Sequence, residues 1–528
     1  MMIISGILDK IHPFNSSALL LGAALFSVFF GLSRKKPVKI FITIISALAF
    51  AYGLFLNIQN YVIGRVFSNY LFNYDFLQMM QISIILFISL NILFFISVNN
   101  IEKNNFIKII IIFNFTVFGS SLYIMSNNFL MIFTSLAVFI TCTFQLISLL
   151  NSNGNIKNVD EYSTRNHLIR YFLVSAFSLL LILAGFSLIF GSTDFKSFSQ
   201  ILESEKIDSA LFKAGVFIIF ASIYFYLFIF PFQGAYIKLT KRCDISSVLV
   251  IWFLYFPSGL FLFLKLKSTL FYFIEKNNFY LTIVFLTIAF LLAVGGNIGA
   301  VKTTSIRRIL AFLFLSSLSI TILAVAGHSL GIIDDKRMDW LIFSNLAVTG
   351  LCYLPIFAVF SEVEKKYGID SIENIKGFAE KNKFVGINLI FLLLSFGGLI
   401  GTSGYIIRFF ILKPIIDYFR NVSLLKTSSY NFILMIFAVI IAAVSFIFFA
   451  ANIIRIIVIV LKKGELKTGD LRETDLKTGK NGKINFSKLH IVYITFYSIL
   501  ILFLGITGLL EIINIDIGFF NFRITAFF

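Results

Sequence analysis

The strongest candidate for chemistry is a single arginine at a position where a charge is costly. Residues 392–413 read LLLSFGGLIGTSGYIIRFFILK, an apolar and glycine-rich run with Arg408 well inside it. A charge at bilayer depth costs about 2.5–3.5 kcal/mol on insertion scales and more in simulations. Two interpretations follow. Arg408 either faces a polar cavity or a partner group, or its long side chain reaches back to the membrane interface.

Two prolines fall inside neighbouring apolar runs in the first half of the chain. Pro231 lies in the run at 213–237, and Pro257 lies in the run at 245–274. A proline removes a helix hydrogen bond and clashes with the preceding turn. Broken helices often line ion paths in transporters, whereas a simple packing kink is the common alternative. Both prolines are therefore candidate helix breaks, and both interpretations stay open.

Other residue types that carry chemistry are too scattered to form a site. The three cysteines and four histidines lie far apart, and no pair has the spacing of metal ligands, so we expect no metal site and no disulfide framework. The stretch GGNIGA at 295–300 is too short and apolar for a dinucleotide fingerprint and is more typical of close packing between helices. We expect no catalytic chemistry in this chain itself.

The composition identifies the environment that must position these residues. Of the 528 residues, 59% are hydrophobic and only 13% are charged, with a mean hydropathy of +0.94. A soluble protein has roughly 45–50% apolar and about 25% charged residues. The sequence therefore predicts an all-α, multi-pass integral membrane protein that contacts the lipid bilayer. The net charge of +18 does not indicate nucleic acid, because the charges lie in connections between apolar runs.

A spanning helix needs about 20 mostly apolar residues, and the sequence offers about fourteen such runs. Those at 245–274 and 430–461 are longer than a straight span requires, which indicates tilt or a break. The predicted spans are 16–33, 38–58, 76–98, 106–124, 127–150, 168–191, 213–237, 245–274, 279–301, 307–332, 338–360, 383–412, 430–461 and 489–515.

The basic residues predict the orientation of these spans. Most of the 44 lysines and arginines lie in the connections that follow odd-numbered spans, for example RKKPVK at 34–39 and KLTKR at 238–242. The positive-inside rule places these connections in the cytoplasm. With an even number of spans, both termini then lie on the non-cytoplasmic side, most simply of a bacterial inner membrane.

One segment is clearly hydrophilic. Residues 462–488 have mixed charges and few apolar residues, and LKTG occurs in them twice. This composition is typical of a mobile cytoplasmic loop, and a partner-binding role is the alternative. The predicted organisation is a membrane domain at 1–461, this charged loop, and a last span with a C-terminal tail at 489–528.

Several stretches together resemble one family, the antiporter-like membrane subunits N, M and L of respiratory complex I and the related D subunit of multisubunit cation/proton antiporters. The resemblance covers about residues 75–515 and rests on the order and spacing of these stretches. They are RYFLVSAFSLLLILAGFSLIFGSTDFKSFSQI at 170–201, GNIGAVKTTSIRRILAFLFLSSLSI at 296–320, IENIKGFAEKNKF at 372–384, SFGGLIGTSGYIIRFFIL at 395–412 and AANIIRIIVIV at 450–460.

The resemblance implies an antiporter-like fold of fourteen helices, with broken helices in two related halves. It places Arg408 on a lysine of the family's helix 12, and Arg455 on an arginine of helix 13 that favours the subunit N branch. It also implies that redox cofactors and quinone belong to other subunits, that this chain has none, and that its partners are other membrane-arm subunits of a respiratory complex.

The sequence departs from the family where the family carries its mid-membrane charges. The resemblance puts Ala137 in place of a helix 5 glutamate and Tyr226 in place of a helix 7 lysine. Tyr255 or Ser258 stands at the helix 8 lysine. Alanine cannot titrate, whereas tyrosine donates and accepts hydrogen bonds. Arginine stays protonated, so Arg408 suits electrostatic gating better than proton carriage.

Two further lysines are candidates for the missing charges. Lys265 and Lys267 follow Pro257 by a turn or two, and either substitute in part for the helix 8 lysine or match the basic residue that ends this helix. Three functions remain: a membrane-arm subunit of a proton-translocating NADH-quinone oxidoreductase, a D-like subunit of a monovalent cation/proton antiporter, or a non-conducting structural subunit of the membrane arm.

Overall fold

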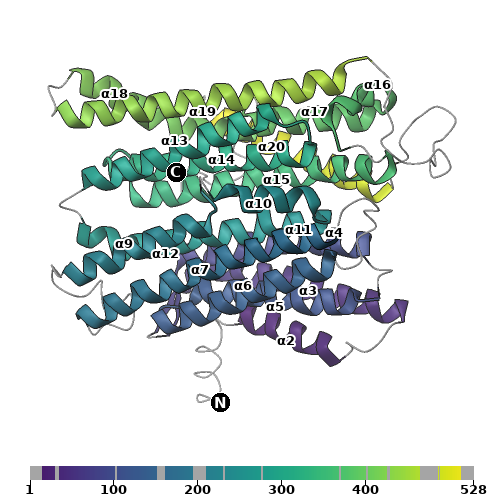
Figure 1. Ribbon diagram of the computed structural model, residues 1–528, viewed down its shortest axis with the longest axis horizontal. Coiled ribbons are helices and arrows are strands. Elements are labelled where there is room, and N and C mark those ends of the chain that lie inside the picture. Colours follow the sequence, from purple (N-terminus) through teal and green to yellow (C-terminus); the bar gives the residue numbers. More distant parts are fainter. Residues whose placement is uncertain are drawn as a thin grey trace. The chain divides into compact units, whose positions relative to one another are not determined.

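The computed structural model describes residues 15–29, 35–69, 71–100, 104–151, 161–193, 210–229, 232–274, 278–367, 370–399, 402–424, 429–463, 486 and 488–512. The chain divides into two compact units, Met1–Lys276 (unit 1) and Asn277–Phe528 (unit 2). Within each unit, long helices pack side by side (Figure 1). The all-α prediction is confirmed for the described residues, apart from one two-stranded hairpin.

Unit 1 carries this hairpin, in which Phe67 pairs with Tyr74 and Ser68 with Asn73 in antiparallel register. Its elements are α2 (Asn15–Phe29), α3 (Lys36–Ile63), β1 (Phe67–Ser68), β2 (Asn73–Tyr74), α4 (Phe76–Asn100), α5 (Phe106–Met125), α6 (Phe129–Asn151), α7 (Glu161–Thr193), α9 (Ala210–Tyr226), α10 (Gln233–Arg242), α11 (Ile245–Val250), the π-helical turn η2 (Ile251–Tyr255) and α12 (Phe256–Ile274).

Unit 2 contains two short helical turns between its long helices. Its elements are α13 (Asn278–Lys302), α14 (Ile306–Ser329), α15 (Asp335–Tyr367), the 3-10 turn η4 (Ile372–Ile375), α16 (Phe378–Lys381), α17 (Lys383–Gly397), α18 (Ser403–Leu424), α19 (Ser429–Leu461) and α20 (Lys488–Ile512). The stretch GGNIGA lies near the end of α13, where a Cβ at Gly296 would come within 2.7 Å of the Phe312 carbonyl of α14. Close helix packing therefore explains this glycine.

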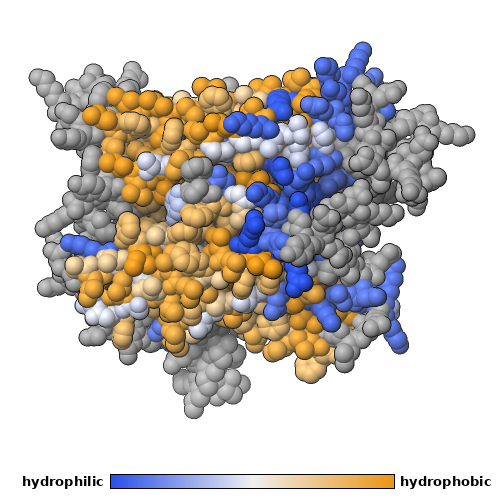
Figure 2. Space-filling model, in the orientation of Figure 1, coloured by the Kyte–Doolittle hydropathy of each residue, from blue (hydrophilic) through white to orange (hydrophobic). Residues whose placement is uncertain are grey.

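Ten of the described helices are long and apolar enough to cross a membrane. Shorter apolar helical segments lie at Ser16–Phe29, Ala210–Tyr226, Lys383–Gly397 and His490–Ile506. The face shown in Figure 2 is dominated by apolar side chains along the helices. Helices that are apolar on all sides belong in a lipid environment. The prediction of an integral membrane protein is confirmed, and the total of about fourteen spans stays a prediction.

Two predicted spans are interrupted near their middle. The span at 213–237 divides into α9 and α10, and the span at 383–412 divides into α17 and α18. Pro231 itself lies outside the described residues. No proline lies within the second of these spans. There the chain leaves the helix at Gly398, which has a φ of +74°, a conformation that glycine adopts without steric cost.

The prediction of a break at Pro257 needs correction. The chain is helical without interruption from Ile245 to Ile274, and Pro257 is the second residue of α12, separated from the π-helical turn η2 by Phe256 alone. Proline has no backbone N–H and therefore removes one helix hydrogen bond. A π-helical turn inserts one extra residue, which allows the helix to continue past the proline. The other long run, predicted as tilted or broken at 430–461, is one continuous helix, α19.

The predicted domain limits at 461 and 488 fall around residues that are mostly outside the described part. Within it, Lys462 accepts a hydrogen bond on its carbonyl from the Gly377 amide at 2.9 Å, and Phe486 packs edge-on against Phe378. The two flanks of the charged segment therefore both contact the connection between α15 and α17.

Candidate functional site

Arg408 lies in α18 and is almost completely buried within unit 2, with 4% of its surface exposed. Its Nη2 donates to the carbonyl oxygen of Phe396 at 2.6 Å, and its Nη1 donates to that of Gly397. Both carbonyls belong to the last turn of α17. The guanidinium therefore binds partner groups within the protein, which agrees with the first of the two interpretations of this residue.

The sequence around the interruption explains why these carbonyls are available. The Gly398 amide donates to the Ser395 carbonyl, and the Leu399 amide donates to the Leu394 carbonyl at 3.1 Å. This pair of bonds with a left-handed glycine is a Schellman motif, which ends the helix and leaves its final carbonyls without intrahelical donors. The guanidinium supplies those donors, and its charge is favourable at the negative end of the helix dipole.

Two aromatic rings of α19 complete the surroundings of Arg408. Its guanidinium carbon lies 4.4 Å from the ring centroid of Phe449 and 5.0 Å from that of Phe446. Both distances fit cation–π contacts, which gain strength where water is excluded. Among the described residues, no carboxylate pairs with Arg408 within 4.0 Å. Within the described part of the chain, backbone carbonyl dipoles and aromatic ring faces thus stabilise this charge.

Two glycines create the space for this arrangement. A Cβ at Gly398 would lie 2.8 Å from Cδ of Arg408. A Cβ at Gly404, in the first turn of α18, would collide with the Ser395 carbonyl. The two halves of the interrupted helix can approach each other only because neither position carries a side chain.

Lys265 of α12 has a comparable role in unit 1. It is buried, and its Nζ donates to the carbonyls of Tyr123 at 3.0 Å and Ile124 at 2.7 Å, in the last turn of α5. Lys265 itself lies inside α12, nine residues before its last residue, and its match to either lysine of the family stays a prediction. Lys267 lies in α12 too, and its side chain is outside the described part.

A cation at the end of another helix is a recurrent feature of this chain. In unit 2, Arg455 of α19 donates to the carbonyl of Val301 at 3.0 Å, in the last turn of α13. A positive charge near a helix C-terminus is stabilising, and the unpaired carbonyls there need donors. Arg408 and Lys265 thus supply donors to buried helix ends, whereas the bond between Arg455 and Val301 is exposed.

Tyr226 and Tyr255 meet in the interior of unit 1. Their rings stack with centroids 4.4 Å apart and planes inclined by 2°. The Tyr226 hydroxyl lies 2.6 Å from the Ser258 hydroxyl, and the Tyr255 hydroxyl donates to the Ser175 hydroxyl at 2.8 Å. The three positions that the resemblance linked to lysines of helices 7 and 8 therefore lie together and are neutral here.

Tyr123 and Tyr171 join Tyr226 and Tyr255 in what we call the tyrosine cluster, and Tyr123 connects this cluster to Lys265. Its hydroxyl donates to the Ser258 carbonyl, and its own carbonyl accepts from Lys265. Tyr171 packs against Tyr255 with ring centroids 5.2 Å apart. Tyr123, Tyr171 and Ser175 were not predicted from the sequence. Their only signal was the presence of polar atoms inside apolar spans, which does not distinguish a cluster from isolated residues.

The end of α9 carries an unusual backbone conformation. Phe228 has a φ of +48°, and it is the one non-glycine residue with positive φ among those described. The Phe228 and Ile229 amides donate to the carbonyls of Phe225 and Tyr224, the same pair of bonds as at Gly398. A left-handed conformation costs a residue with a Cβ roughly 1–2 kcal/mol. The packing of the Phe228 ring offsets this cost, because the ring stacks on that of Tyr171 with centroids 5.3 Å apart.

Unit 2 has a second polar site, which was not predicted from the sequence. Asn297 of α13 donates to the Ser316 hydroxyl of α14 at 2.9 Å, and Asn452 of α19 donates to the Asn297 side-chain carbonyl at 3.3 Å. All three are buried. Such hydrogen bonds link helices in a membrane. Ser317 of α14 is buried and donates to the Phe314 carbonyl.

Comparison with known proteins assigns this architecture. Residues 126–433 match the family model described as NADH:quinone oxidoreductase/Mrp antiporter, TM. The chain belongs to this family. The matched region includes Lys265, Arg408 and the whole tyrosine cluster except Tyr123.

Relatives in this family are distant. The chain is 21% identical over 412 residues to NADH-quinone oxidoreductase subunit N 2 of Thermodesulfovibrio yellowstonii, a match that covers 76% of this chain and 83% of the relative. It is 23% identical to the chloroplastic NAD(P)H-quinone oxidoreductase subunit 2 of Mesostigma viride, covering 58% of each chain. Several of these matches, like the latter, span less than two thirds of the relative's length.

Solved structures share the fold across nearly the whole chain. A chain of the Mrp complex from a Dietzia species superposes with a TM-score of 0.74 at 13% identity, covering 96% of this chain and 95% of that one. A chain of respiratory complex I from Thermus thermophilus superposes with a TM-score of 0.68 at 15% identity, and the match covers 94% of this chain and 98% of that one. These likenesses establish the antiporter-like fold.

Proposed function

We propose that the chain is a membrane-arm subunit of a proton-translocating NADH-quinone oxidoreductase, most like subunit N. Its membership of the NADH:quinone oxidoreductase/Mrp antiporter family supports this proposal, as do relatives that bear the name subunit N. The structural observation that carries it is Arg408, a buried charge held across an interrupted helix. A buried charge inside the membrane is costly and is retained chiefly for function.

In this function Arg408 acts as a fixed charge and not as a proton carrier. Its guanidinium stays protonated and repels a proton that approaches the interruption between α17 and α18. Movement of α18 relative to α17 would break its bonds to the Phe396 and Gly397 carbonyls and shift this charge. Such a displacement would make proton passage depend on the position of α18 relative to α17.

In unit 1 the proton path would use hydroxyl groups. Tyr226 and Ser258 form one hydroxyl pair, and Tyr255 and Ser175 form another. A hydroxyl can accept one proton while donating its own, so each pair can pass a proton without gaining a charge. The onward hydrogen bonds of Ser258 and Ser175 end on carbonyl oxygens. Water would therefore have to connect the two pairs.

The proposal extends to the architecture. The Schellman motifs at the ends of α9 and α17 support two related halves, each with one interrupted helix, within a protein of about fourteen spans. By the positive-inside rule both termini would lie on the non-cytoplasmic side of a bacterial inner membrane. The partners would be other membrane-arm subunits, which would hold the redox cofactors and quinone.

Two other functions each have an observation in their favour. The neutral tyrosine cluster favours a non-conducting structural subunit of the same membrane arm, because no titratable lysine or glutamate occupies it among the described residues. The fold likeness to a chain of an Mrp complex favours a D-like subunit of a monovalent cation/proton antiporter.

Identification of co-purifying proteins by mass spectrometry, after gentle solubilisation of membranes that carry a tagged chain, tests the proposal. Recovery of other complex I membrane subunits together with redox subunits is the expected result. Recovery of small antiporter subunits without redox proteins would overturn it in favour of the antiporter. A chain that purifies alone would leave neither assembly tenable.

A further inference from the structure

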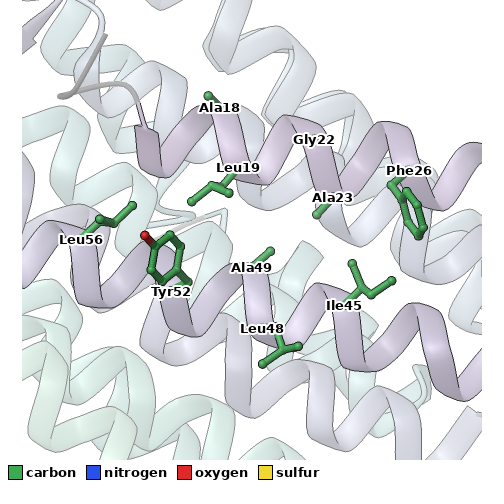
Figure 3. A pocket seen from close by; sticks show the side chains of 10 residues that line it. All are labelled: Ala18, Leu19, Gly22, Ala23, Phe26, Ile45, Leu48, Ala49, Tyr52 and Leu56. Atoms are coloured by element: carbon green, nitrogen blue, oxygen red, sulfur yellow. The ribbon is translucent and has the colours of Figure 1, made fainter. Parts of the chain in front are cut away.

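A groove of about 980 Å³ lies between α2 and α3 in unit 1 (Figure 3). The side chains that line it are apolar apart from one tyrosine hydroxyl, and it belongs to neither of the sites described above. Its volume falls in the range of roughly 300–1,000 Å³ that is typical of small-molecule sites. The lining residues are Ala18, Leu19, Gly22, Ala23 and Phe26 of α2 and Ile45, Leu48, Ala49, Tyr52 and Leu56 of α3.

Small residues create this groove, and the two helices do not close it. In membranes, small residues on facing helices usually let the backbones approach closely. Here a Cβ added at Gly22 would meet no atom within 4 Å. At one end Phe26 packs against Phe41, with ring centroids 6.3 Å apart, and this bulky pair holds the helices apart. The hollow is therefore built into the helix pair.

The groove faces the surroundings of the protein. Leu48 and Tyr52 on its rim are 62% and 54% exposed. The most apolar window of α3 is only 28% buried, against 67% for α4 and for α5. An occupant of the groove therefore has to be apolar along its length and must enter from the membrane side.

Two lysines lie at the end of the helix pair where α3 begins. Lys35 and Lys36 are exposed, and within the described part of the chain neither pairs with a carboxylate. Lys36 precedes Ile45 by roughly 14 Å along the helix axis at about 1.5 Å per residue. Half of a bilayer with its headgroups is about 20 Å thick. A lipid whose phosphate lies at these lysines would thus have acyl chains long enough to enter the groove.

We propose that the groove between α2 and α3 binds an acyl chain of an anionic phospholipid whose phosphate is bound by Lys35 and Lys36. The apolar lining selects the chain, and the lysines select the negative headgroup over a zwitterionic one. A transmembrane helix of a partner subunit would also fill an apolar groove, but it would leave the two exposed lysines at its end without a negative partner. Charge complementarity therefore favours the lipid.

Native mass spectrometry of the full-length chain in mild detergent tests this site. The probes are phosphatidylglycerol and phosphatidylcholine with identical acyl chains. We expect the wild type to retain phosphatidylglycerol several-fold more than phosphatidylcholine. The double variant Gly22→Leu/Ala49→Leu fills the groove and should lower retention of both lipids several-fold. Lys35→Ala/Lys36→Ala should remove most of the preference for phosphatidylglycerol, since a basic residue near a membrane surface contributes about fivefold to such binding.

Ala51→Leu is the matched control, because Ala51 is an exposed alanine of α3 outside the groove. It should retain both lipids as the wild type does, and the melting temperatures of all variants should stay close together. Unchanged retention in the groove-filling variant would overturn the proposal. So would unchanged lipid retention combined with the loss of a co-purifying membrane subunit, because a partner helix would then be the occupant.

Discussion

Arg408 of α18 donates from its Nη2 to the carbonyl oxygen of Phe396 at 2.6 Å, so that α18 is bonded to the end of α17, the preceding part of the same interrupted span. This bond explains how an arginine persists at membrane depth: the carbonyls need donors and the guanidinium needs acceptors. It also makes the geometry of the interruption depend on one side chain. A change at Arg408 must therefore affect both the local charge and the orientation of α18.

Replacement of Arg408 by alanine should abolish most coupled proton movement while the chain still assembles. The loss of the charge removes the electrostatic barrier, and the two released carbonyls each cost about 1–3 kcal/mol when left unpaired. The measurement is substrate-driven proton uptake in reconstituted vesicles. Lys413→Ala is the control, because Lys413 lies in the same helix and is exposed. Wild-type coupling in Arg408→Ala would reduce this residue to a structural cap.

Gly404→Ala should destabilise unit 2 much more than Gly234→Ala destabilises unit 1. Both glycines lie in the first turn of a helix that follows an interruption. A Cβ at Gly404 collides with the Ser395 carbonyl, whereas a Cβ at Gly234 meets nothing within 4 Å. Overpacking of this kind costs typically about 1–3 kcal/mol. Thermal unfolding in detergent compares the two variants, and equal melting temperatures would contradict the close approach of α17 and α18.

Phe228→Gly tests whether backbone strain or ring burial dominates at the end of α9. The glycine would relieve roughly 1–2 kcal/mol of left-handed strain. It would also remove a fully buried ring, and truncation of a core phenylalanine to alanine costs about 3–5 kcal/mol. We therefore expect net destabilisation, visible as a lower melting temperature. A stabilised variant would mean that the strain outweighs the packing.

The sequence predicted the membrane environment and singled out Arg408. It did not predict which groups Arg408 contacts. Composition alone identified a membrane protein, and an arginine inside an apolar run identified Arg408, because both signals are local. The acceptors of Arg408 were not predictable from local pattern. They exist because a glycine without a neighbouring proline ends α17, and glycine is common inside spans that do not break.

Long-range contacts account for most of what the sequence did not reveal. Lys265 is separated by about 140 positions from the carbonyls that it caps, and no periodicity connects them. Pro257 shows the opposite case: a local signal made it a candidate helix break, but the helix continues past it next to a π-helical turn. The resemblance placed Tyr226 and Tyr255 at related positions, yet only the structure shows their rings stacked.

Lys265→Met should lower stability and separate a structural role from a proton-carrying one. Methionine keeps an apolar stem of similar length and leaves the Tyr123 and Ile124 carbonyls without donors. We expect a lower melting temperature in detergent, with the exposed Lys238→Met of α10 as a neutral control. If Lys265 only caps α5, coupled proton uptake per folded complex should stay at the wild-type value. A loss of uptake without a loss of stability would make it part of the path.

Tyr226→Phe gives the sharpest decision between a conducting unit 1 and a structural one. The substitution keeps the ring that stacks on Tyr255 and removes only the hydroxyl that contacts Ser258. Loss of this hydrogen bond should cost about 1 kcal/mol in either case. If the hydroxyl pair passes protons, coupled uptake should fall at least tenfold, whereas Tyr61→Phe in α3 should leave it unchanged. Full uptake in Tyr226→Phe would exclude this hydroxyl from the path, and the neutral cluster would then be a packing core around which unit 1 assembles.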